Sequence, residues 1–352
     1  DKEKKKYPEK LKNSLAISLK RITLEDTNIE FFTQLNAQPK SGLQRVSVDA
    51  EKVLYDPVKS LEENFRKRIP GVVINAGSSF HIFKKTGYKI ETGQITLASS
   101  KRSISIKNFR YGPESIKIRK AIISGRGSVH HFNISGIDMR NINLNELTAN
   151  KRLYSDRLYI SEPKIFIFRN RNIMRKKRTF NKKLPQQIFR ESDLKIAMDI
   201  IRLKNGTIEY SEVASGEKRA ESIIFTGLDL SMRDISNFPE VLRTGRESEI
   251  SVSFKLMGRS TLKGKIIIPV NNRKNRFSFS GSLKRTDPEI FSHYLRRNAR
   301  VRINSGKLKY MNFRVNADEE KASGFMKLSY QDLRVSLLRK NNFARKSRFR
   351  TF

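Results

Sequence analysis

Alternation of apolar and polar residues runs through most of this chain, and it limits the folds that the chain can adopt. The pattern is regular over residues 103–107, 250–256, 276–280 and 333–337. A period of two gives a strand one apolar and one polar face, which is typical of antiparallel sheets with one wet side. Many polar positions hold Lys, Arg or Ser, so much of the positive charge belongs to the wet face. The sequence therefore predicts a mainly β fold.

The composition favours a thin sheet over two packed layers. Hydrophobic residues make up 37% of the chain, and counting the 18 Gly in place of the 10 Tyr raises this only to about 39%. An ordinary globular domain has ~45–50% apolar residues. We therefore expect an elongated, twisted antiparallel sheet curled into an open groove.

A few short helices are expected beside the sheet. Asp56-Pro57 precedes residues 58–68, and Asp287-Pro288 precedes residues 290–295. Pro at the first helical position behind an Asp cap is a favourable helix start. A third short helix is expected over residues 143–150. All three would cap or connect strands.

One ten-residue pattern recurs along the chain. It reads apolar, any residue, apolar, two residues, then Gly, Thr or Pro, one residue, apolar, any residue, apolar. The copies are residues 22–31, 88–97, 158–167, 201–210 and 301–310. The pattern predicts a strand, a tight turn or bulge, and a second strand. Any long β protein contains hairpins of this shape, so the copies are either ordinary hairpins or a repeated unit.

Basic residues are in large excess and are concentrated in one segment. Lys plus Arg number 73 against 35 Asp plus Glu, which gives a formal net charge of +38. Residues 169–183, RNRNIMRKKRTFNKK, contain no acidic residue. We interpret residues 169–186 as a basic loop or linker between two halves of a β groove, residues 1–168 and 187–352. Contact with a partner or with lipid headgroups is expected from Arg169, Arg171, Arg175, Lys176, Lys177 and Arg178.

The sequence contains no pattern that is typical of a catalytic or metal site. It has no Cys and only four His, of which His130 and His131 are adjacent and so point to opposite faces of a strand. A phosphate-binding Gly-rich loop, an HExxH sequence and a nucleophile elbow are all missing. We expect a protein that is not an enzyme and that holds neither a metal nor a cofactor.

Nucleic acid is the obvious partner for a charge of +38, but the chain has no recognised nucleic-acid-binding motif. The charge is spread over every segment, which favours a wet sheet face or attraction to an anionic membrane surface. We do not expect nucleic acid to be the partner, and we keep a basic nucleic-acid-binding protein as an alternative.

Three stretches resemble the AsmA-like family of bacterial envelope proteins. Residues 133–147 with 158–165 are similar to the family's strand, short helix and strand ending in x-x-Pro-x-apolar. Residues 200–210 resemble its apolar strand, Asn-Gly, apolar strand opening. Residues 303–308 with 322–335 resemble its C-terminal segment, including Gly-x-apolar-x-apolar-x-Tyr-x-Asp-Leu. The chain departs from the family in lacking the N-terminal membrane helix and in being more basic.

The resemblance implies a periplasmic trough that moves phospholipid between the inner and outer membranes of a Gram-negative envelope. It also implies an inner-membrane anchor, which would lie in a segment absent from this chain. Other envelope proteins are possible partners, and a non-catalytic structural subunit of an envelope complex is the second hypothesis. In that case the basic loop would dock an acidic partner.

The residues themselves suggest how such a groove would work. If a sheet with one apolar face curls, that face becomes a groove in which acyl chains lie while headgroups stay wet. Alternatively, the same side chains pack in a closed sandwich core. The residues expected to line the groove are the paired apolar positions of the repeated pattern: Ile22, Leu24, Ile29, Phe31, Ile90, Ile95, Leu97, Leu203, Ile208, Ile303 and Leu308.

Overall fold

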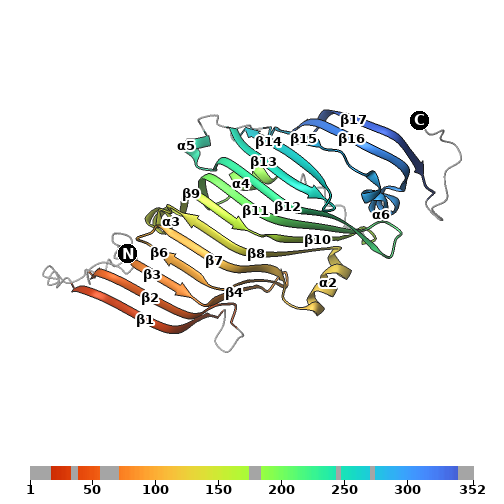
Figure 1. Cartoon of the computed structure of the whole chain (residues 1–352). Coiled ribbons are helices and arrows are strands. Elements are labelled where there is room, and N and C mark those ends of the chain that lie inside the picture. The colour runs from red at the N-terminus through yellow and green to blue at the C-terminus, as the bar shows by residue number, and fades with distance from the viewer. Residues whose placement is uncertain are drawn as a thin grey trace, which may run out of the picture.

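A single large sheet makes up most of the protein (Figure 1). The computed structural model describes residues 17–32, 39–55, 71–173, 184–242, 247–269 and 274–339. Within these residues, 17 strands join one sheet, and the few helices are short. The predicted mainly β fold is confirmed.

The first part of the chain contributes ten strands and two helices. They are β1 (Ile17–Phe31), β2 (Ser41–Tyr55), β3 (Val72–Ala76), β4 (Ser78–Phe83), β5 (Tyr88–Thr92), β6 (Ile95–Ala98), β7 (Ser103–Pro113), α2 (Ile116–Arg126), β8 (Ser128–Arg140), α3 (Leu144–Asn150), β9 (Arg152–Ser161) and β10 (Lys164–Asn170).

The second part contains the longer strands. It comprises α4 (Pro185–Arg190), β11 (Lys195–Val213), β12 (Ala220–Ser236), α5 (Pro239–Leu242), β13 (Glu247–Leu256), β14 (Ser260–Pro269), β15 (Phe277–Leu283), η2 (Pro288–Phe291), α6 (Ser292–Tyr294), η3 (Leu295–Ala299), β16 (Val301–Ala317) and β17 (Ala322–Leu337).

The sheet is mixed: the antiparallel arrangement that the sequence predicts holds for most pairings and fails around β11. β11 runs parallel to both β9 and β10, while the other pairings are antiparallel among the strands described. The chain leaves β10 at one end of the strands and returns to the other end before β11 begins, so that Lys195 pairs with Arg152. The connection that makes this return contains the basic segment 169–186 and α4. The sheet is therefore continuous across the boundary between the two predicted halves.

Three neighbouring pairs of strands are collinear and occupy one row each: β3 with β4, β5 with β6, and β9 with β10. The 17 strands consequently make fourteen rows. At ~4.8 Å between neighbouring strands, the sheet extends about 60 Å across its rows.

The repeated pattern forms bulges within strands or short breaks between collinear strands, and its interpretation as hairpins is wrong. Between Leu203 and Gly206, β11 carries one residue more than β12 opposite it, and β12 carries the extra residue in the next step. Asn205 adopts a left-handed backbone with φ of 54° at this bulge. Asp229 holds it in place by accepting a hydrogen bond from the Asn205 N–H at 3.1 Å. The bulge reading of the pattern is therefore the correct one.

Two of the expected short helices are present. Asn143 caps α3 by accepting from the Glu146 N–H, and Asp287 caps η2 in the same way through the Glu289 N–H. The helix expected over residues 58–68 lies outside the described residues. The sequence patterns did not predict α2. Gly125 lies within this helix, and Gly127 follows its last residue with φ of 69°.

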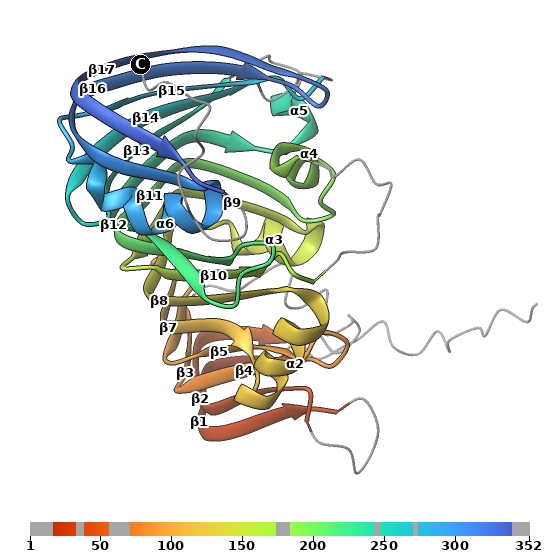
Figure 2. The same ribbon diagram turned by 90° about the vertical axis from the view of Figure 1, so that its right-hand side faces the viewer.

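The strands are bent into arcs, as Figure 2 shows for β16 and β17. At one end of the arcs, α4 is tied to the β14–β15 turn, because the Arg190 guanidinium donates to Asn275 Oδ1 at 2.8 Å. At the other end, α6 contacts both β12 and β16. These short segments link strands that are several rows apart and so hold the bend.

The bulge in β16 gives a direct test of the fold. Gly306 has φ of 124°, and a Cβ there would lie 2.4 Å from Leu333 Cα on β17. We expect Gly306→Ala to lower the free energy of unfolding by roughly 3 kcal/mol, through backbone strain and overpacking. Urea unfolding measures this, with Gly125→Ala in α2 as the control, since a Cβ there meets open space. Equal stability of the two variants would contradict the bulge.

Candidate functional site

The register places apolar side chains on one face of the sheet in every row. Residues that pair directly across strands share a face, so the pairing can be followed from β1 to β17. This face, called the apolar face below, carries Ile22 and Leu24 on β1, Val48 and Ala50 on β2, Val72 and Ile74 on β3, Ile95 and Leu97 on β6, Ile104 and Ile106 on β7, Ile137 and Met139 on β8, Leu158 and Ile160 on β9, Ile201 and Leu203 on β11, Leu230 and Met232 on β12, Ile250 and Val252 on β13, Ile266 on β14, Phe279 on β15, Phe313 and Val315 on β16, and Met326 on β17.

The bulges keep this face apolar along each strand as well as across the rows. An unbulged strand would turn residue 206 to the opposite side from Leu203, because their spacing is odd. The extra residue in the bulge restores the alternation, so that Ile208 and Tyr210 share the face of Ile201 and Leu203. The same correction occurs in β1 between Leu24 and Thr27.

All eleven residues that were expected to line the groove lie on the apolar face. Ile22, Leu24 and Phe31 are 40%, 42% and 56% exposed. Ile29, Ile90, Ile95, Leu97, Leu203, Ile208 and Ile303 are half-buried. Leu308 is buried, in a small cluster with Leu262 and Leu283.

No second layer of sheet covers the apolar face in the part of the chain described. The half-buried state of its side chains follows from contact with neighbours in the same sheet. The closed sandwich core that the sequence left open is therefore not the arrangement of these strands.

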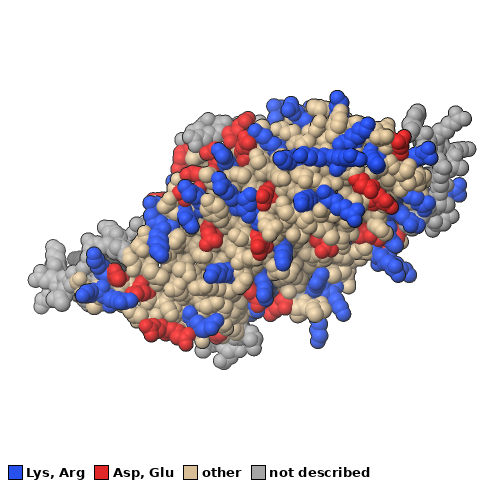
Figure 3. Space-filling view, viewed as in Figure 1, with Lys and Arg blue, Asp and Glu red and all other residues tan. Residues whose placement is uncertain are grey.

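The apolar face lines the inner side of the bend. In Figure 2 the strands bow toward the side that Figures 1 and 3 present, and Figure 3 shows Lys, Arg, Asp and Glu distributed over that outer side. Charged residues over the strands, such as Arg202, Asp229 and Lys265, belong to the opposite face, called the polar face below. The outward side is thus polar and the inward side apolar.

Aromatic rings line the apolar face near one end of the strands. Tyr111 stacks on Phe132 with ring centroids 5.4 Å apart, and Tyr88 lies 5.0 Å from Tyr111. Burial raises the pKa of the Tyr111 hydroxyl above its ordinary value, and the nearby Tyr88 raises it further. Tyr88 opens the copy of the repeated pattern at residues 88–97, whereas the sequence analysis did not single out Tyr111 and Phe132.

Charged groups meet the apolar face at the ends of β10 and β11. Arg169 pairs with Glu212 two residues beyond Ile167 and Tyr210, on the same face. The buried Glu212 carboxylate lies 3.9 Å from Arg169 and 3.5 Å from Arg171, and it accepts the Tyr210 hydroxyl at 2.5 Å. Arg169 and Arg171 are thus engaged at the rim of the sheet. Arg175, Lys176, Lys177 and Arg178 lie outside the described residues.

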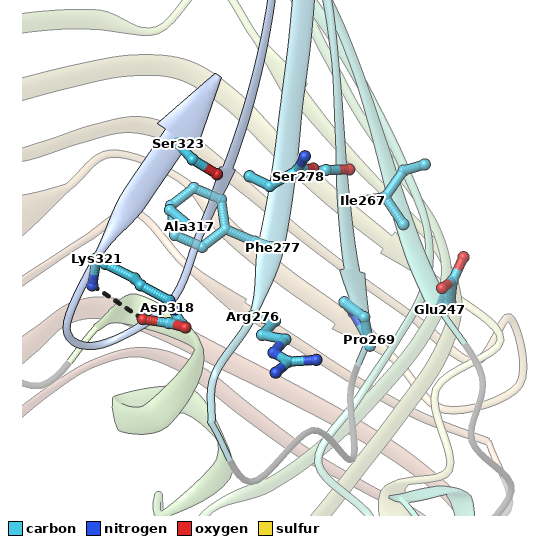
Figure 4. Close-up of a pocket in the computed structure, with 11 residues that line it drawn as sticks. Glu247, Ile267, Pro269, Arg276, Phe277, Ser278, Ala317, Asp318, Lys321 and Ser323 are labelled. Carbon is cyan, nitrogen blue, oxygen red and sulfur yellow. Dashed lines mark hydrogen bonds between the residues drawn. The ribbon is translucent and has the colours of Figure 1, made fainter.

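Three of the hollows formed by described residues lie on the polar face of β11–β17. Ser231, Ser251 and Lys263 line one of about 550 Å³. A second, of about 430 Å³, is lined by Lys263, Ser280 and Arg314. The third, of about 460 Å³, lies around Ser278 at the end of β15 (Figure 4).

No protein-family model and no curated protein matches this chain. Among the described residues, His, Asp and Glu form no group of three that could hold a metal ion. The helices described are all too short or too polar to cross a membrane.

An open apolar face and a buried core respond differently to a charge. Leu203 is half-buried on the apolar face, whereas Leu283 is 3% exposed in the small cluster. We expect Leu283→Asp to lower the free energy of unfolding by about 4 kcal/mol, and Leu203→Asp by only about 1–2 kcal/mol. Urea titrations followed by circular dichroism measure both. Similar losses in the two variants would show that the apolar face is covered.

Proposed function

We propose that this protein binds phospholipid acyl chains along its apolar face and moves lipid between two membranes. The single observation that carries the proposal is the apolar face, which extends through all fourteen rows and which no second layer of sheet covers within the described ranges. The resemblance to AsmA-like proteins supports the same role. On this proposal the protein is a non-catalytic carrier in the periplasm, anchored at the inner membrane and moving lipid toward the outer one.

The energetics of an apolar face suit transfer of lipid. An acyl chain that leaves a bilayer for this face exchanges one apolar environment for another, so the free energy of the step is small. The headgroup stays in water at the open side of the bend. A site that bound lipid tightly would slow the release of the lipid. A long surface that is apolar throughout lets acyl chains move along it without a large change in free energy.

The dimensions also favour several lipids at once. The face extends about 60 Å across its rows, against ~15 Å for half of a ~30 Å hydrocarbon core. One lipid would cover only a part of this distance. We therefore propose a file of lipids whose chains lie over successive rows.

Lipid extraction and mass spectrometry on the protein purified without added lipid test the proposal. Phospholipid should co-purify, and the protein should transfer fluorescent phospholipid between vesicles. We expect Leu203→Asp and Ile208→Asp to reduce transfer about tenfold while the protein stays folded. Ser231→Asp is the matched control, since Ser231 lies on the polar face beside Leu230.

The alternatives give different results in the same experiments. A DNA titration at physiological salt should show only weak binding, and a lipid-free protein with tight DNA binding would favour the nucleic-acid-binding alternative. A protein that binds neither ligand would favour the structural subunit. Replacing Arg175, Lys176, Lys177 and Arg178 by Gln should then abolish capture of an acidic partner.

A further inference from the structure

The polar face of β14–β16 contains a narrow lane with a floor of small hydroxyl side chains. β15 contributes Ser278, Ser280 and Ser282, whose side chains share the polar face because they alternate along the strand. The first and the last serine are four positions apart in the strand, which corresponds to about 13 Å. Short side chains on this strand lie between longer ones on its neighbours. One hollow lies over Ser280 and Ser282, and another lies over Ser278.

The walls of the lane are basic and amide-bearing. Lys263 and Lys265 on β14 pair with Ser282 and Ser280, which in turn pair with Asn312 and Arg314 on β16. The two walls are two rows apart, or about 10 Å. This width admits a sugar ring or a phosphate group between the walls, above the serine floor.

The positive charge in the lane is only partly neutralised. Lys265 pairs with Glu249 at 2.8 Å, whereas the ion pairs among the described residues include neither Lys263 nor Arg314. In an adjacent hollow, Lys263 also faces Ser251 and Ser253. Lys263 and Arg314 line the same hollow, and two cations without an ion pair in the described part of the chain attract an anion.

An aromatic ring completes the lane. Phe325 on β17 pairs with Arg314, so it lies on the polar face, and it is 62% exposed. Phe325 lines the same hollow as Lys263, Ser280 and Arg314, and its ring is open to solvent there. Such a ring is suited to packing against the flat apolar side of a sugar.

The far end of the lane is electrically balanced. Around Ser278, Figure 4 shows Arg276 and Lys321 together with Asp318 and Glu247. Asp318 accepts from the backbone N–H groups of Glu320 and Lys321, each at 2.9 Å. The basic part of the lane is therefore confined to the region of Lys263, Lys265 and Arg314.

We propose that this lane binds an anionic saccharide, that is, a sugar chain that carries phosphate or carboxylate groups. The cations bind the anionic groups, Ser280, Ser282 and Asn312 exchange hydrogen bonds with sugar hydroxyls, and Phe325 packs against a ring. Single-stranded nucleic acid is the less suitable ligand, because its binding surfaces use successive aromatic rings as stacking platforms. The lane offers one ring and a floor of hydroxyls.

Titration calorimetry on the full chain tests the proposal with defined probes. The probes are a tetragalacturonate, a phosphorylated disaccharide, neutral maltotetraose and an eight-nucleotide thymidine strand. We expect the two anionic saccharides to bind, and added salt to weaken them. Lys263→Gln and Arg314→Gln should each raise Kd about fivefold, and Ser280→Tyr should block binding by filling the lane. Lys107→Gln, on the polar face of β7, is the matched control and should leave Kd unchanged.

Several outcomes would overturn the proposal. One is failure of both anionic saccharides to bind. Another is binding that Lys107→Gln weakens as much as Arg314→Gln does, which would indicate attraction to the overall charge. Tighter binding of the thymidine strand than of the saccharides would assign the lane to nucleic acid. Circular dichroism establishes that Ser280→Tyr is folded, and the two Gln variants carry the test if it is not.

Discussion

The rest of this structure depends on one constraint, which is that apolar side chains must stay on one face of long, bent strands. A bend needs bulges, and each bulge would reverse the facing of every later residue if the sequence did not compensate. In the repeated pattern, the second apolar residue and the Gly, Thr or Pro are three positions apart instead of two. This odd spacing supplies the compensation. Asn205 and Gly306, both with positive φ, show the backbone conformation that the step requires. The continuous apolar face is the result.

Much of the apolar face was predictable from the sequence, because its two causes are local. Alternation fixes which residues share a face, and the repeated spacing fixes where the alternation shifts. The eleven predicted residues, from Ile22 to Leu308, accordingly lie on one face. The interpretation as hairpins failed because a hairpin turn and a bulge use similar residues. Only the pairing with a neighbouring strand, such as that of Gly206 with Leu228, distinguishes them.

Other features depend on contacts between residues far apart in sequence, and no local pattern indicates them. The parallel pairing of β11 requires that the basic connection return along the strands, and its composition suggested only a linker. The buried Glu212 forms ion pairs with both Arg169 and Arg171. In the sequence these two arginines are only part of a basic run, and nothing there indicates the ion pairs. The lane on the polar face forms only when three strands pair in register. The sequence around Ser280, Lys263 or Arg314 alone therefore does not indicate a binding site.

The central claim is that acyl chains lie along the apolar face, and photo-crosslinking tests it most directly. A phospholipid with a photoreactive group at the end of one acyl chain would be incorporated, irradiated and mapped by peptide mass spectrometry. The account predicts crosslinks on apolar-face residues in strands from β1 to β17, and few on the polar face. Crosslinks confined to a single row, or spread equally over both faces, would contradict it.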